Sequence, residues 1–90
     1  MQVAFGKLPI KMSVGSPLSG IVAVAYVYWF VPASIGDQFV LNDGSGNLVL
    51  PGNCEVAGQS QWFNFSGRPV QCNGLALARN DSGTLYVYPA

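Results

Sequence analysis

Few residues in this chain carry side chains suited to acid–base, nucleophilic or metal chemistry. The sequence contains no histidine, so the commonest general base and metal ligand is missing. Its carboxylates offer one pair for acid–base work, Asp43 and Asp81. Both stand in turn sequences, NDGSGN and NDSG, where aspartate bonds to its own backbone. We therefore expect no catalytic residues, no cofactor and no enzymatic activity.

The turn sequence NDGSGN also resembles a calcium-binding loop, because Asp43, Ser45 and Asn47 stand at alternating positions. An EF-hand loop that began at Asp43 would need glycine where Leu48 stands and glutamate where Cys54 stands. We therefore interpret this segment as a hairpin turn and expect no metal site.

The two cysteines, Cys54 and Cys72, allow two interpretations. A disulfide between them would stabilise the fold by about 3 kcal/mol through the entropy of the closed loop. Alternatively, both are buried thiols that behave as small apolar residues. We expect free thiols, because the sequence shows no export signal and intracellular compartments keep thiols reduced. Without a histidine, neither thiol has a base to activate it, and two sulfurs alone do not make a zinc site.

Short segments rich in β-branched and aromatic residues alternate with turn residues along the whole chain, and no segment has a helical period. We expect a broken edge segment within residues 2–14 and strands at 21–31, 38–41, 48–50, 61–65, 75–79 and 84–88. In the last of these, TLYVY, Leu85 and Val87 share one face, and Thr84, Tyr86 and Tyr88 share the other. The pattern predicts one all-β domain over residues 1–90, an antiparallel β-sandwich or jelly-roll-like fold of about seven or eight strands.

The segment IVAVAYVYWFV (residues 21–31) is apolar on both faces of the expected strand. It is too short for a membrane helix, which needs roughly 20 apolar residues. A small sandwich can bury one face of a strand, so the other face needs a different cover. We expect the odd-numbered residues to face the core and the even-numbered face to meet a neighbouring subunit or another protein. That candidate interface comprises Val22, Val24, Tyr26, Tyr28 and Phe30. The alternative is that the loops of the chain itself shield this face.

The chain carries very little charge, which limits the classes of partner. Only 9% of its residues are charged, and four basic residues balance four acidic ones. A net charge near zero favours association and is typical of a surface that partners cover. Nucleic acid is an unsuitable partner, because phosphate binding needs clustered Lys and Arg.

The C-terminal part of the chain, roughly Asp37 to Pro89, resembles small structural proteins of tailed bacteriophages. The resemblance rests on the hairpin FVLNDGSGNLVL, the strand WFNF, the segment PVQCNGLAL and the closing SGTLYVYP. It implies a virion component, either a head decoration or cement protein or a neck or tail accessory, assembled in the host cytoplasm. By analogy with decoration proteins we expect a homo-oligomer, a trimer, on a major capsid or other virion protein.

A different class of function is also compatible with the sequence. A small carbohydrate-binding or adhesin-like module, associated with a tail or fibre, would share the fold and would use exposed Trp and Tyr side chains to stack on sugar rings. The sequence contains Trp29, Trp62 and four tyrosines, without indicating which of them face solvent.

Overall fold

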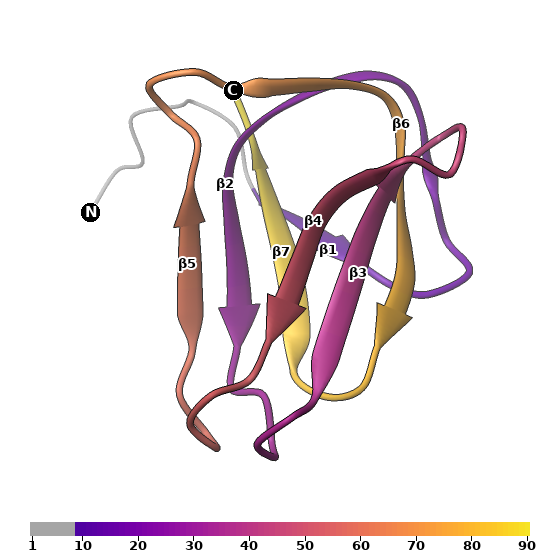
Figure 1. Cartoon of the computed structure of the whole chain (residues 1–90). Coiled ribbons are helices and arrows are strands. Elements are labelled where there is room, and N and C mark those ends of the chain that lie inside the picture. The colour runs from indigo at the N-terminus through magenta and orange to yellow at the C-terminus, as the bar shows by residue number, and fades with distance from the viewer. Residues whose placement is uncertain (1–8) are drawn as a thin grey trace.

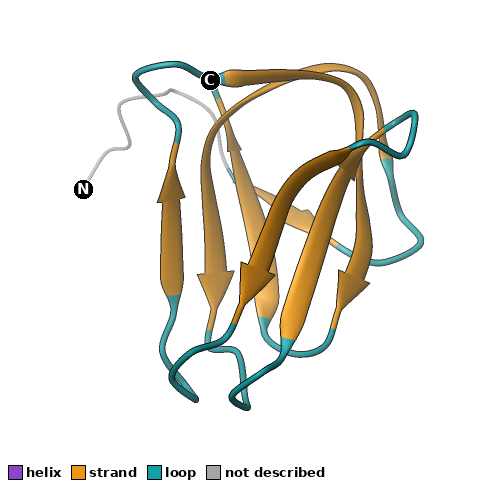
Figure 2. Ribbon diagram, viewed as in Figure 1, coloured by secondary structure: helices purple, strands orange, loops and turns teal. Residues whose placement is uncertain are grey.

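The structure is a computed structural model that describes residues 9–90. Its described residues form strands and loops and contain no helix (Figure 2). The strands are β1 (Ile10–Met12), β2 (Leu18–Phe30), β3 (Gln38–Asp43), β4 (Leu48–Asn53), β5 (Gln61–Asn64), β6 (Val70–Asn80) and β7 (Thr84–Pro89). The all-β class predicted from the sequence is therefore confirmed. Of the broken edge segment expected within residues 2–14, β1 is observed, and residues 2–8 lie outside the described part.

The strands form one continuous antiparallel sheet that folds over into two layers (Figure 1). Along the sheet the order is β1-β7-β2-β6-β3-β4, and β5 pairs with β2. The long strand β2 belongs to both layers, because residues 18–24 pair with β6 whereas residues 26–29 lie between β5 and β7. The β3–β4 hairpin passes in front of β7 and β1 in Figure 1. The result is a small β-sandwich with nested, jelly-roll-like pairings.

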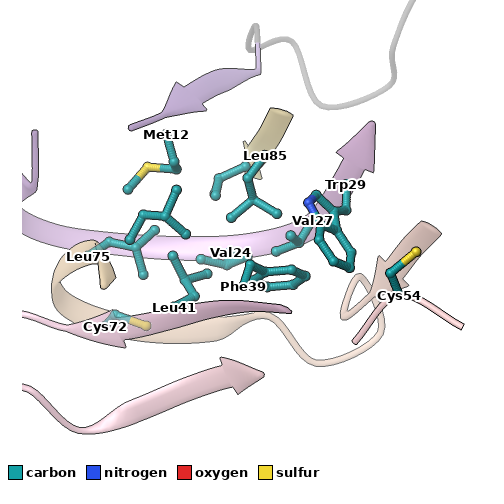
Figure 3. Packing of buried hydrophobic residues seen from close by; sticks show 12 residues of the cluster. Met12, Val24, Val27, Trp29, Phe39, Leu41, Cys54, Cys72, Leu75 and Leu85 are labelled. Carbon is teal, nitrogen blue, oxygen red and sulfur yellow. The ribbon is translucent and has the colours of Figure 1, made fainter. Parts of the chain in front are cut away.

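The hydrophobic core fills the space between the two layers (Figure 3). Trp29 of β2 contacts Phe39 of β3 with 4.9 Å between ring centroids, and Phe39 also contacts Phe63 of β5 at 5.6 Å. From β7, Leu85 and Val87 are fully buried, as the alternation in TLYVY predicts. The indole N–H of Trp29 donates to the Ser82 carbonyl at 2.9 Å, so the one polar atom of this large side chain is satisfied.

The bounds of β2, β4 and β6 differ from those predicted from the sequence. β2 ends at Phe30, because Val31 has a positive φ of 49° and is followed by Pro32. The β3–β4 hairpin predicted around NDGSGN is present, and β4 continues as far as Asn53. The strand expected at 75–79 begins earlier, at Val70, since Gly74 with φ 82° bends β6 without ending it.

Candidate interaction surface

The outer face of β2 differs from the face predicted from the sequence, because β2 contains a bulge at Ala25. Val24 pairs with Pro89 and Tyr26 pairs with Tyr88, so one extra residue is inserted in β2 between these two pairs. The bulge reverses the alternation of the strand. Before it, Val24 faces the core, and after it Val27 does.

The predicted interface is therefore wrong for two of its five residues. Val24 is only 1% exposed and Val22 packs against the core cluster, so neither shares a face with Tyr26, Tyr28 and Phe30. The predicted core face is wrong in the complementary way, because Ile21 is 70% exposed. Tyr26, Tyr28 and Phe30 do lie on the outer side of the sheet, where they alternate with the buried Val27 and Trp29.

The outer side of the layer β5-β2-β7-β1 carries a cluster of aromatic rings, which we call the aromatic face. Strand register places Tyr28 between Trp62 of β5 and Tyr86 of β7, and Tyr26 next to Tyr88. The ring centroids of Tyr28 and Trp62 are 4.2 Å apart, and those of Tyr28 and Tyr86 are 6.5 Å apart in a stacked arrangement. The face comprises Tyr26, Tyr28, Phe30, Trp62, Tyr86 and Tyr88.

Two members of the aromatic face are strongly exposed. Trp62 is 57% and Phe30 47% exposed, whereas the four tyrosines are half-buried. A shallow pocket of about 280 Å³ lies over the β2–β7 part of the face, lined by Pro9, Tyr28, Phe30, Tyr86 and Tyr88. Strand register puts Lys11 opposite Tyr86 and Asn64 opposite Tyr26, so polar groups border the rings. The arrangement is a broad apolar surface with a polar rim, a composition that protein interfaces and ligand sites share.

Sequence reasoning missed Trp62, Tyr86 and Tyr88 as members of this face. The alternation in TLYVY did place the two tyrosines together on one side of the last strand. The neighbours of β2 in this layer are β5 and β7, which are distant in the sequence. Their long-range pairing with β2 brings the rings together, and no local sequence pattern predicts it.

The Asp43 carboxylate is used inside its own turn. Its Oδ1 accepts hydrogen bonds at 2.9 Å from the backbone N–H groups of Ser45 and Asn47, and its Oδ2 accepts one from Asn47 Nδ2 at 3.2 Å. The hydrogen bond from the Asn47 backbone, with the others in the turn, lowers the pKa of Asp43 below its ordinary value. The hairpin-turn interpretation is confirmed, because the carboxylate oxygens point back at the turn.

The two carboxylates singled out in the sequence do not come together. Asp43 ends β3, whereas the backbone N–H of Asp81 bonds to Gln38 at the other end of that strand. Asp81 instead accepts from Arg79, 2.9 Å from its Nε, and from the Gln38 backbone N–H. These bonds, that of Arg79 first, lower the pKa of Asp81. Within residues 9–90, no three His, Cys, Asp or Glu side chains gather where they could hold a metal ion.

Both cysteines are buried and free, as expected. Figure 3 shows them at opposite ends of the core cluster, Cys54 beside Trp29 and Cys72 near Leu75. The Cys54 thiol donates to the Val56 carbonyl at 3.3 Å. Burial, and to a lesser extent the charge of Asp43, raises the pKa of Cys72, which keeps that thiol protonated and unreactive.

Comparisons with known proteins found no relative of this chain, because no protein-family model, no curated protein and no solved structure matches it. Within the described residues there is also no helix of the length and apolarity needed to cross a membrane.

Proposed function

We propose that this protein is a non-enzymatic structural component of a bacteriophage virion, a head decoration or cement protein that attaches to the capsid surface through its aromatic face. The aromatic face is the observation that carries the proposal. It presents Trp62 and Phe30 to solvent on a sheet surface whose central ring is Tyr28. Exposed apolar patches on small proteins are typical of interaction sites.

The residue types of the aromatic face suit a surface that is hydrated in the free protein and buried after assembly. Tyrosine brings a large apolar area and keeps a polar hydroxyl, and aromatic residues are enriched at the centres of protein interfaces. The border is only weakly charged, because Lys11 is the cation paired with the face by strand register and Asn64 is neutral. A neutral, aromatic face favours contact with another protein over contact with a charged polymer such as nucleic acid.

The phage-like order of hairpin and strands in Asp37–Pro89 supports the placement in a virion. The same resemblance suggests self-association on the capsid. The trimer suggested by analogy with decoration proteins stays a prediction.

The test is co-sedimentation of the protein with virus-like particles made from the capsid protein of the same phage. Trp62→Ser and Phe30→Ser should each weaken particle binding by at least about tenfold, because exposed aromatic anchors dominate interface energies. Leu48→Ser is the matched control, because Leu48 is 60% exposed but lies on β4, outside the aromatic face. Equal binding by all four proteins, or no binding by the wild type, would contradict the proposal.

One observation favours carbohydrate binding as a second candidate function. The ring centroids of Trp62 and Tyr28 are 4.2 Å apart, and Trp62 is 57% exposed, so a sugar ring can stack on the indole. Asn64, on the same strand, provides a polar neighbour. A glycan array followed by titration of the Trp62 fluorescence tests this candidate. Saturable quenching that Trp62→Ser abolishes would favour it over capsid attachment.

A further inference from the structure

The edge strand β5 exposes a set of backbone hydrogen-bonding groups that the described chain leaves unused. In an antiparallel ladder, hydrogen-bonded and non-hydrogen-bonded residue pairs alternate. The backbone N–H of Phe65 donates to the Ala25 carbonyl at 2.7 Å, which extends the register in which Asn64 is opposite Tyr26. The hydrogen-bonded partners of β2 are therefore Phe63 and Gln61. The N–H and C=O groups of Trp62 and Asn64 consequently point away from β2, toward the open side of β5.

The other two terminal strands of the described sheet carry features that hinder pairing with a further strand. β1 has three residues and carries the exposed Lys11. In β4, the Cys54 N–H bonds to the Asp37 carbonyl at 2.8 Å, so by the same alternation Pro51 occupies an outward-pointing position and presents no donor there. Short length, lysine and proline are the means by which proteins protect sheet edges.

β5 is also short, with four residues, but it lacks the other two protections. Its sequence, QWFN, contains neither charge nor proline. Figure 1 places it at the margin of the molecule, with β2 as its neighbour in the sheet. Trp62, the most exposed ring of the aromatic face, stands on this edge. An unprotected edge beside an exposed aromatic side chain is a template for strand addition.

We propose that β5 pairs antiparallel with β5 of a second copy of this chain across a twofold axis at Phe63. Trp62 then lies opposite Asn64 of the second copy, so the outward N–H and C=O groups of both residues find partners in both copies. The edge is uncharged and self-complementary, which a twofold contact between identical strands requires. The layers of both copies join into one sheet, and their aromatic faces become continuous across the axis.

This pairing closes on itself. Once both β5 edges are used, the remaining terminal strands β1 and β4 are the protected ones, so the contact gives a dimer and not a fibre. The inference deepens the proposed function and rests on it in one respect, that the protein self-associates as a building unit. It predicts a twofold unit in place of the trimer suggested by analogy.

The first measurement is hydrogen exchange of individual backbone amides at low and high protein concentration. The Trp62 and Asn64 amides should become protected as concentration rises, in parallel with dimer formation seen by analytical ultracentrifugation. Association through the aromatic face alone would leave these two amides exchanging freely, because it uses side chains and not the edge of β5. Free exchange of both amides in an associated protein would therefore overturn the inference.

The decisive variant is Asn64→Pro, which removes an outward N–H that β2 does not use and so should leave the fold intact. It should weaken dimerisation by at least about tenfold, since the hydrogen bond is lost at both symmetry-related positions. Asn64→Ala is the matched control, because it also removes the bond from the Ser66 N–H to Asn64 Oδ1 but keeps the backbone donor. Asn64→Ala should dimerise as the wild type does.

The outcomes separate this inference from the proposed function. A wild-type monomer or trimer, or an Asn64→Pro dimer of unchanged affinity, overturns edge pairing, whatever the particle binding. A wild-type dimer that Asn64→Pro dissociates supports it, even if neither protein binds particles. In that last case the capsid role fails and edge pairing stands.

Discussion

Gly52 lies at a position where the core leaves no room for a side chain. It lies opposite Phe39 in the β3–β4 hairpin, and a Cβ at position 52 would overlap the Phe39 ring. Phe39 cannot move aside, because it is fully buried between Trp29 and Phe63. Gly52→Ala should lower the free energy of unfolding by about 2 kcal/mol or more, as overpacking of cores does. Urea denaturation followed by tryptophan fluorescence measures the change.

Gly67 provides the control for this substitution. It lies in the turn between β5 and β6, and a Cβ there would meet open space. Gly67→Ala should leave the free energy of unfolding within about 0.5 kcal/mol of the wild type. An equal loss in both variants would mean that lost glycine flexibility, and not the Phe39 ring, causes the effect.

The carboxylates of Asp43 and Asp81 predict how stability depends on pH. Hydrogen bonds lower both pKa values in the folded protein below the ordinary value of 3.8. Groups of this kind stabilise the fold at pH values above the ordinary pKa, and the stabilisation is lost as pH falls through the lowered pKa of the folded state. The free energy of unfolding should therefore decrease below about pH 4.

Neutral variants test which residues cause this decrease. Asp43→Asn and Asp81→Asn should each make the stability curve flatter on the acid side, measured by thermal unfolding from neutral to acidic pH. If both variants keep the slope of the wild-type curve, other carboxyl groups cause the acid sensitivity. Addition of calcium should leave the melting temperature unchanged, since the Asp43 oxygens bond within the turn.

At the scale of elements, the sequence predicts the strands better than the faces that they present. The β3–β4 hairpin, β5 and β7 follow from turn residues and from local alternation, and these are short-range signals. The bulge at Ala25 is different. Both sides of IVAVAYVYWFV are apolar, so the residue pattern does not reveal that the core-facing residues change from even to odd numbers at position 25. No turn residue or glycine marks this change. The faces of β2 are fixed only by its partners β6, β7 and β5.

The bulge at Ala25 leads to a prediction about chain length within β2. Deletion of Ala25 would remove the extra residue, so that Val24, Val27 and Trp29 alternate regularly and all keep facing the core. This variant should still show a cooperative unfolding transition by circular dichroism. Deletion of Tyr28, in the regular part of β2, would instead turn Trp29 out of the core, and the cost of about 5 kcal/mol or more should exceed the stability of a small domain and abolish that transition.

Deletion of Ala57 is the control, because that residue is exposed in the loop between β4 and β5. Loops tolerate such changes, and this variant should still unfold cooperatively. Loss of the cooperative transition on deletion of Ala25, with the Ala57 deletion unaffected, would contradict this expectation and show that the bulge itself is required for folding.

At the scale of the whole molecule, the two sides of one strand serve different purposes. The side of β2 that carries Val27 holds the layers together, and the side that carries Tyr28 forms the centre of the aromatic face. Within residues 9–90, no third layer of strands lies over this face, and the proposed function assigns the face to contact with another protein. Stability and assembly should therefore respond to charge at neighbouring positions in opposite ways.

Introducing a glutamate on each side of β2 separates the two purposes. Val27→Glu should unfold the domain, because an unpaired buried charge costs several kcal/mol and the domain has little stability to lose. Tyr28→Glu should remain folded but lose binding to virus-like particles, because the carboxylate reaches solvent in the free protein and loses it in the interface. Tyr28→Gln removes the same ring without adding charge, and it should bind particles with intermediate affinity. Circular dichroism and co-sedimentation provide the two measurements. An unfolded Tyr28→Glu variant, together with a wild type that neither self-associates nor binds particles, would assign both sides of β2 to the stability of one chain.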